Sequence, residues 1–349
     1  MTNIVTIGGG TWTYNLLSAL KNLDDVDVSA IVTMSDDGWS TGKIRDEYWS
    51  LPPWDLRRAI VALSDDEKTQ ILRQIFNHRF QYWTFEGHNL GNIIMTALEQ
   101  MTDNFGQAVN MLEELFDIKG RVYPATFEKT RLIAKLENLD YIIWETNIDI
   151  PKHDPNLRIQ ELHIIKEEYV SAIEKLSYEK WISHHIIESV YEKFFEDKPA
   201  ENPYIPDVIE KADYIIFSPG DLFTSLLPNI LVWNIAYNIK NSKAKKILFW
   251  NLFTKYWETT WFQLSDFLDE FSKYLGKDVF DKILVQDWDN HSLDDEILEK
   301  YSKENKTLIK NDIQDYRIIS RDFIKQSDLI RHDAEKMKQV IMEIVRWEV

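Results

Sequence analysis

The chain has 349 residues, 44% of them hydrophobic, and a formal net charge of −18. It contains no cysteine, which excludes disulfides and thiolate metal sites and fits a reducing compartment. A surface this acidic repels a phosphate backbone, so we expect no nucleic-acid partner. No apolar run approaches the roughly 20 residues of a membrane span, and the N-terminus shows no signal-peptide pattern. We therefore expect a cytoplasmic protein.

Glycine is scarce in this chain and tryptophan is abundant. There are 11 glycines and 13 tryptophans. A glycine content of ~7% would give about 24 glycines in a chain of this length. The shortfall in glycine therefore matches the number of tryptophans.

The first elements predict a parallel sheet. Residues 3–7 are a short apolar run with β propensity, residues 12–23 carry leucines on one helical face, and residues 26–34 predict a second strand. A strand, a glycine-rich turn, a helix and a strand make a βαβ unit, whose strands are parallel. The next predicted helices are 55–64, 66–78, 89–101 and 106–116.

The middle of the chain changes character before the α/β pattern resumes. Segments such as 131–136 and 141–143 predict antiparallel strands, and 167–203 is charged and helical. The later predicted strands are 214–217 and 246–249, and the later predicted helices are 262–275 and 328–346. We expect an α/β fold in which helices cover both faces of a mostly parallel sheet. The chain would form a single domain, 1–349, with 120–203 as an inserted β/helical subdomain.

The loop after the first strand, Gly8-Gly9-Gly10-Thr11, is suited to a phosphate. Glycines let backbone amides approach a phosphate, and the next helix offers free N–H groups and the positive end of its dipole. The loop lacks the Gly-Lys-Ser/Thr ending of a P-loop, and it is not a complete dinucleotide fingerprint. A tight strand-to-helix turn explains the same residues equally well.

The second strand leads into Asp36-Asp37-Gly38, with Ser40 two residues further on. Paired aspartates at a strand end can hold a divalent cation or accept hydrogen bonds from sugar hydroxyls. The alternative is a turn that caps a helix.

Further segments combine polar residues with helix starts. Asp55, Arg57 and Arg58 are candidate ligand groups, although Asp55 can also be an N-cap and the arginines can be solvated surface. Residues 86–92 place a histidine and two asparagines among glycines before an apolar helix, which favours a functional histidine over a structural one. Residues 217–225 form a second strand–loop–helix anion site, and 251–259 form a polar loop beside it.

Taken in order, these motifs resemble the YvcK-like branch of the CofD-like (2-phospho-L-lactate transferase-like) superfamily. The match spans most of the chain and is weakest over 151–210. The motifs are specific jointly rather than singly. They are Ile7-Gly8-Gly9-Gly10-Thr11, Asp36-Asp37-Gly38-x-Ser40-x-Gly42, Leu51-Pro52-Pro53-x-Asp55-Leu56-Arg57-Arg58, Gly87-His88-Asn89-Leu90-Gly91-Asn92, Ser218-Pro219-Gly220 through Ser225, Glu258-Thr259 and Arg331-His332-Asp333.

The resemblance implies a Rossmann-like core and a nucleotide ligand. The YvcK branch is associated with gluconeogenic growth, cell shape and UDP-sugar binding. The CofD branch transfers a phospholactyl group from a nucleotide diphosphate donor to a deazaflavin and requires magnesium. The Asp-Asp-Gly-x-Ser and Pro-Pro-x-Asp-Leu-Arg-Arg patterns look like the YvcK branch, and we see no deazaflavin signature.

We therefore expect a protein that binds a nucleotide diphosphate or UDP-sugar, with transfer of a phosphorus-containing group as the alternative. The resemblance also implies magnesium, with Asp36 and Asp37 as its candidate ligands. Catalytic residues and a homo-oligomer are left open. The expected ligand-binding residues are Gly8, Gly9, Gly10, Thr11, Trp12, Asp36, Asp37, Gly38, Ser40, Asp55, Arg57, Arg58, His88, Asn89, Asn92, Ser218, Pro219, Gly220, Asp221, Thr224, Ser225, Asn229, Asn251, Thr254 and Glu258.

Tryptophan stands at several positions where this family has glycine. A loop whose amides touch a phosphate has no room for an indole, and a non-glycine residue at positive φ is strained. The affected positions are Trp12, Trp39, Trp54, Trp144 and Trp257, with Trp49, Trp233 and Trp261 as further cases.

Two interpretations of these tryptophans stay open. In one, they are genuine, and the protein has lost or rebuilt its site. In the other, which we favour, the gene uses UGA for glycine, as some bacterial lineages do, and the printed chain reads UGA as tryptophan. Trp83, Trp181, Trp250, Trp288 and Trp347 lie outside the motifs that bear on this choice.

Overall fold

A computed structural model gives the structure of the protein. It describes residues 1–38, 41–42, 51–65, 68–82, 85–149, 154–178, 184–291, 293–325 and 330–347. Of the sequence predictions, those for Ser40, Trp39, Trp49, Trp83 and Trp181 fall outside these residues.

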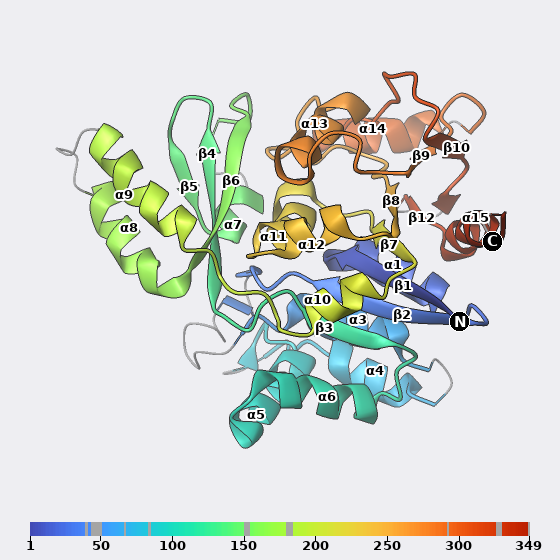
Figure 1. The fold of residues 1–349 in the computed structure, drawn as a ribbon, viewed down its shortest axis with the longest axis horizontal. Helices are drawn as coiled ribbons and strands as arrows, with labels where there is room; N and C mark the ends of the chain where they lie inside the picture. Colours follow the sequence, from blue (N-terminus) through green and yellow to red (C-terminus); the bar gives the residue numbers. More distant parts are fainter. Residues whose placement is uncertain are drawn as a thin grey trace.

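A seven-stranded parallel sheet forms the centre of the fold (Figure 1). The strand order is β10-β9-β8-β7-β1-β2-β3, and each neighbouring pair is parallel. The predicted α/β class is therefore confirmed. The strands are β1 (Thr2–Gly8), β2 (Val26–Val32), β3 (Arg121–Pro124), β7 (Tyr214–Phe217), β8 (Lys245–Phe249), β9 (Lys282–Gln286) and β10 (Ile318–Arg321).

The order of the strands reverses between β1 and β7. From β1 the chain adds β2 and β3 on one side, and it later returns to place β7 on the other side of β1. Ile4 pairs with Tyr214, and Ile7 pairs with Phe217. In open parallel sheets, ligands bind beyond the carboxyl ends of the strands at such a switch point.

Successive residues of each strand enter two different cores, because side chains alternate between the faces of a sheet. Ile4 and Ile216 pack on one face, and Val5 and Ile215 pack on the other. The first face is covered by α1 (Gly10–Leu20), α3 (Trp54–Leu63), α4 (Gln70–Asn77), α5 (Leu90–Thr102), α6 (Phe105–Leu115) and α15 (Ala334–Trp347). The second is covered by α10 (Ile205–Glu210), η3 (Leu222–Leu226), α11 (Leu227–Leu231), α12 (Ile235–Asn241) and α13 (Leu264–Leu275).

A smaller antiparallel sheet of order β5-β4-β6 lies beside the main sheet (Figure 1). Leu132 and Leu162 pack in the same core as Val5, while Ile133 and Ile165 pack with Tyr191. The predicted antiparallel strands are thus confirmed. The elements are β4 (Thr130–Leu136), β5 (Tyr141–Ile143), α7 (Glu145–Asp149), β6 (Ile159–Lys166), η2 (Glu167–Tyr169), α8 (Val170–Tyr178) and α9 (His184–Glu196).

β3 and the last helix bear on the boundaries of two predicted segments. β3 belongs to the main sheet, so the small sheet starts at Thr130; a separate subdomain over 120–203 stays a prediction. The last helix starts at Ala334 rather than at 328, because Asp333 caps its amides and β12 (Arg331–His332) pairs with β11 (Ile324–Lys325). A further helix, α14, spans Asp295–Lys303.

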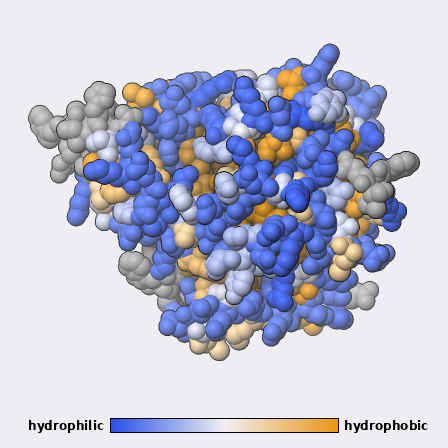
Figure 2. Space-filling model, in the orientation of Figure 1, coloured by the Kyte–Doolittle hydropathy of each residue, from blue (hydrophilic) through white to orange (hydrophobic). Residues whose placement is uncertain are grey.

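The face shown in Figure 2 is mostly hydrophilic, and its hydrophobic residues form separate small patches. Among the described residues, no single helix has the length and apolar character to cross a membrane. A bent pair, Leu222–Leu231 and Ile235–Asn241, reaches that length and composition only together, with an angle of 81° between its parts.

Candidate ligand-binding site

A cavity of about 250 Å³ lies at the carboxyl ends of β1, β2 and β7. Because β1 and β7 flank the point where the strand order reverses, this is where an open parallel sheet binds ligands. The cavity is lined by Gly9, Gly10, Thr11, Trp12, Asp36, Trp54, Asp55, Glu145, Asp149, Gly220, Asp221, Thr224 and Ser225.

The loop after β1 meets a carboxylate from α3. The backbone N–H of Gly10, the first residue of α1, donates to Asp55 Oδ1 at 2.7 Å. A Cβ on Gly9 would lie 2.7 Å from Asp55 Oδ2, so a larger residue there would displace the Asp55 carboxylate. Asp55 is not the N-cap of its own helix, since Pro53 holds that place. It instead satisfies an N-terminal amide of α1.

Burial, reinforced by the charge of Asp36, raises the pKa of Asp55 to about 7. Burial also raises the pKa of Glu145 well above its ordinary value, with Asp36 as the next cause. The pKa of Asp221 is raised in the same way by burial and by Glu258. These three carboxyl groups therefore hold their protons more strongly than exposed carboxyl groups do.

The loop after β7 is held by residues from the loop after β8. Asn251 donates from Nδ2 to Gly220 O at 2.6 Å and accepts from Gly220 N at 2.8 Å. Glu258 accepts from Phe223 N at 3.3 Å and from the Thr224 hydroxyl at 3.2 Å. These contacts fix the start of η3 against the cavity.

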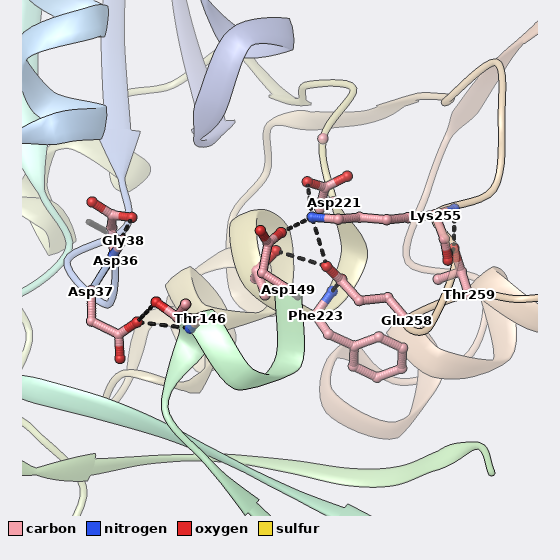
Figure 3. A network of polar contacts seen from close by, with 12 residues as sticks. Asp36, Asp37, Gly38, Thr146, Asp149, Asp221, Phe223, Lys255, Glu258 and Thr259 are labelled. Carbon is pink, nitrogen blue, oxygen red and sulfur yellow. Dashed lines mark hydrogen bonds and ion pairs between the residues drawn. The ribbon is translucent and has the colours of Figure 1, made fainter. Parts of the chain in front are cut away.

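The side chains of Asp36 and Asp37, the predicted metal ligands, contact different parts of the structure. Asp36 lines the cavity, and its Oδ1 accepts from Gly38 N at 3.2 Å. Asp37 accepts from the amides of Glu145 at 3.1 Å and Thr146 at 2.7 Å. Figure 3 shows the two carboxylates pointing in different directions. The structure therefore does not bring the pair together around one point, and the carboxylate of Asp37 instead caps the start of α7.

Three other carboxylates do converge, and they surround a lysine (Figure 3). Lys255 Nζ lies 2.7 Å from Asp221 Oδ2 and 2.9 Å from Glu258 Oε1, and it also contacts Asp149. This donor set fits a divalent ion in chemical type. The position between the three carboxylates is taken by the ammonium group.

Trp12 and Trp54 are among the residues that line the cavity. Trp12 packs edge-on against His332, with 5.1 Å between ring centroids, and the guanidinium of Arg57 lies 4.8 Å from the Trp54 ring. Ligand pockets for small molecules are roughly 300–1,000 Å³. The cavity, at about 250 Å³, is smaller than that range. Two of its lining residues, Trp12 and Trp54, stand where the family resemblance implies glycine.

Several predicted binding residues lie elsewhere in the fold. Arg57 is buried rather than solvated, and it donates to Phe76 O at 2.7 Å. Asn89 caps α5 by accepting from Asn92 N at 3.3 Å. His88, Asn89 and Asn92 do not line this cavity.

Some of the other residues outside the cavity wall contact its loops. A Cβ on Gly8 would collide with Ser218 Oγ, which shares a 2.6 Å hydrogen bond with Thr13. Asn229 donates to Ser225 O at 2.8 Å, and Thr254 bonds to Thr307. The others not lining the cavity are Gly8, Asp37, Gly38, Arg58, Ser218, Pro219, Asn229, Asn251, Thr254 and Glu258.

Trp54, Glu145 and Asp149 line the cavity but were not among the predicted site residues. Lys255 was also missed. A signal for Glu145 was present, because Trp144-Glu145 repeats the tryptophan–glutamate pattern of Trp257-Glu258. Asp149 has no comparable signal, since it reaches the cavity only because α7 projects from the small sheet.

Comparisons with known proteins agree over nearly the whole chain. Residues 4–330 match the family described as 2-phospho-L-lactate transferase CofD. The putative gluconeogenesis factor of Thermotoga maritima is 36% identical over 354 residues, covering 99% of both chains. The gluconeogenesis factor of Bacillus subtilis is 31% identical over 350 residues, covering 98% of both.

A solved structure shows the same fold. The crystal structure of a protein from Bacillus halodurans aligns with a TM-score of 0.82 and 29% identity, covering 98% of this chain and 99% of that one. The predicted resemblance is confirmed by these matches together. The chain belongs to the CofD family, in the YvcK-like branch that contains the gluconeogenesis factors.

Proposed function

We propose that the protein binds a nucleotide sugar, such as a UDP-sugar, in the cavity between β1 and β7, and acts as a regulator of gluconeogenic growth and cell shape. The observation that carries this proposal is the position of the cavity at the switch point of the sheet, between the N-terminal ends of α1 and η3. Helix starts of this kind favour a diphosphate. The names of the relatives support the link to gluconeogenesis.

The surroundings of the cavity support recognition of both parts of such a ligand. Gly10 and Thr11 lie at the start of α1, Thr224 and Ser225 line the cavity from η3, and Ser225 Oγ lies close to Gly10. Asp36 offers a carboxylate that can accept hydrogen bonds from sugar hydroxyls. A diphosphate would lie between the two helix starts, with the sugar or ribose near the end of β2.

Isothermal titration with UDP-N-acetylglucosamine, UDP-glucose, UDP and free sugar tests this proposal. We expect saturable binding that needs the diphosphate, without turnover of the ligand. Ser225→Phe should abolish binding because Ser225 faces the cavity, whereas Ser302→Phe, on the exposed surface of α14, should not. An absence of heat with every nucleotide diphosphate, in the printed chain and in a variant with Trp12 and Trp54 replaced by glycine, would contradict the proposal.

The physiological part needs a separate experiment. Expression of this chain in Bacillus subtilis without its own gluconeogenesis factor should restore growth on a gluconeogenic carbon source and normal cell shape. The Ser225→Phe variant should restore neither, if ligand binding serves the regulation. Equal rescue by the printed chain and the Ser225→Phe variant would show that the regulation does not depend on ligand binding in the cavity.

The alternative is transfer of a phospholactyl-type group from a nucleotide diphosphate donor. Magnesium would neutralise charge on the transferred phosphoryl group in such a reaction. A clamp made of Asp36, Asp37 and Asp55 is disfavoured because Asp37 is bound to the start of α7. Mass spectrometry of the ligand after incubation with magnesium and a deazaflavin acceptor distinguishes the two functions.

A further inference from the structure

Lys255 lies at the centre of a cluster that has the form of a metal site. Asp149 comes from α7, Asp221 from the loop after β7, and Glu258 from the loop after β8. One carboxylate oxygen of each lies within 4.8 Å of the others. Lys255 Nζ contacts all three, and Figure 3 shows the ammonium between them.

The cluster also belongs to the wall of the cavity. Asp149 and Asp221 line the cavity, and the Glu258 side chain is fully buried behind them. Asp36, Asp55 and the carboxyl group of Glu145 complete an acidic surrounding. An anionic ligand entering this cavity needs a positive charge close by, because like charges at these distances repel.

We propose that Lys255 takes the place of a divalent cation at this corner of the cavity. Three converging carboxylates would otherwise provide an oxygen site suited to a hard cation. The Lys255 ammonium contacts the same three carboxylates and brings one positive charge, which the chain itself supplies. It also joins α7 to the two loops that hold η3, so the cluster keeps its shape without an ion.

The consequence for the ligand rests on the proposed nucleotide binding. The Lys255 side chain is 24% exposed, and its partner Asp221 faces the cavity. Its charge therefore offsets the carboxylates nearest to a bound diphosphate. Binding of the diphosphate should then be independent of divalent metal at this cluster.

Counting bound Mn²⁺ by electron paramagnetic resonance, with no nucleotide present, tests the first part. Lys255→Met should bind one more Mn²⁺ per chain than the wild type. Adding Glu258→Gln to that variant should remove the extra ion. Lys211→Met is the matched control: it removes the same charge from an exposed pair with the single carboxylate of Asp207, and it should gain no ion.

Equal Mn²⁺ counts for the wild type and a folded Lys255→Met variant would overturn the proposal, as would a gain by Lys211→Met. The wild type provides a test that does not depend on the stability of any lysine variant. If Glu258→Gln alone lowers its Mn²⁺ count by one, the wild-type cluster already holds an ion and the proposal is wrong; an unchanged count supports it.

The nucleotide arm uses UDP-N-acetylglucosamine and is read separately. Wild-type affinity should be the same in EDTA and in Mn²⁺. Lys255→Met should bind about tenfold more weakly in EDTA, because the carboxylates nearest to the diphosphate are then uncompensated, and should recover in Mn²⁺. Wild-type binding that vanishes in EDTA would overturn metal independence. If no form binds any nucleotide, the proposed function fails, while the Mn²⁺ counts still decide the role of Lys255.

Discussion

Replacing Trp261 by glycine should stabilise the protein, although it removes the largest side chain in favour of the smallest. Trp261 has a φ of 68° and its side chain is 65% exposed. A left-handed conformation costs an L-residue roughly 1–2 kcal/mol. The greater freedom of glycine in the unfolded chain offsets roughly 0.5–1 kcal/mol of that relief. We expect a net gain in the free energy of unfolding of about 1 kcal/mol.

Thermal and denaturant unfolding of three variants measure this effect. Trp261→Ala is the matched control, since it removes the indole but keeps the Cβ that disfavours positive φ, and it should give no comparable gain. Trp288→Gly should lose roughly 3–5 kcal/mol, because its indole donates to Ile309 O at 2.9 Å and packs among buried residues. A destabilised Trp261→Gly, or equal effects of glycine and alanine at 261, would refute the conformational argument.

Trp144 and Trp257, which lie next to site residues, have positive φ values like that of Trp261. Their φ values are 87° and 80°, and each directly precedes a glutamate of the site. Glycine should relieve the same strain there, with a smaller gain. The guanidinium of Arg131 lies 4.2 Å from the Trp144 ring, and the Tyr256 ring lies 4.5 Å from that of Trp257, so each substitution also loses a contact.

These conformations support the hypothesis that UGA is read as glycine in the native host. Apart from these three tryptophans, the non-glycine residues with positive φ in the described chain are Leu139 and several aspartates and asparagines, which adopt that region more readily. The intact mass of protein from the native host tests the hypothesis directly. A mass that matches thirteen tryptophans, or UGG codons at the three positions, would reject it.

Three further predictions concern the cavity. Asp55→Asn should stabilise the protein at pH 8 by up to about 4 kcal/mol, because the folded pKa of about 7 lies above the unfolded value of 3.8. The wild type loses stability as the pH rises from about 4 to about 7, because the buried Asp55 carboxyl group resists ionisation, and the neutral asparagine avoids this loss. If Asp55→Asn changed the free energy of unfolding equally at pH 4 and pH 8, the raised pKa of Asp55 would be contradicted. Replacing both Trp12 and Trp54 by glycine should enlarge the cavity and tighten binding of UDP-N-acetylglucosamine in isothermal titration; unchanged affinity would show that the indoles do not limit it. Asn251→Ala should cost about 1–3 kcal/mol in thermal unfolding, because it leaves both backbone groups of Gly220 without their side-chain partner.

Local sequence patterns predicted much of the main sheet. Residues 3–34 carry an apolar run, a glycine turn, a leucine-faced helix and a second apolar run, and they form β1, α1 and β2. β3, β9 and β10 were not predicted. β3 and β10 are partly exposed and lack the continuous buried run of β7 and β8. β9 carries an apolar run like that of β8, and the sequence interpretation missed it.

The sequence by itself determined the fold class, the family and the loops at the carboxyl ends of β1, β2 and β7. Those features rest on residues close together in the chain. The tertiary structure alone decided what the polar side chains contact. It turned Asp37 toward α7, buried Arg57 against the end of α4, and placed Lys255 between carboxylates more than 100 residues apart. Such contacts depend on how distant segments pack, and no local pattern records that packing.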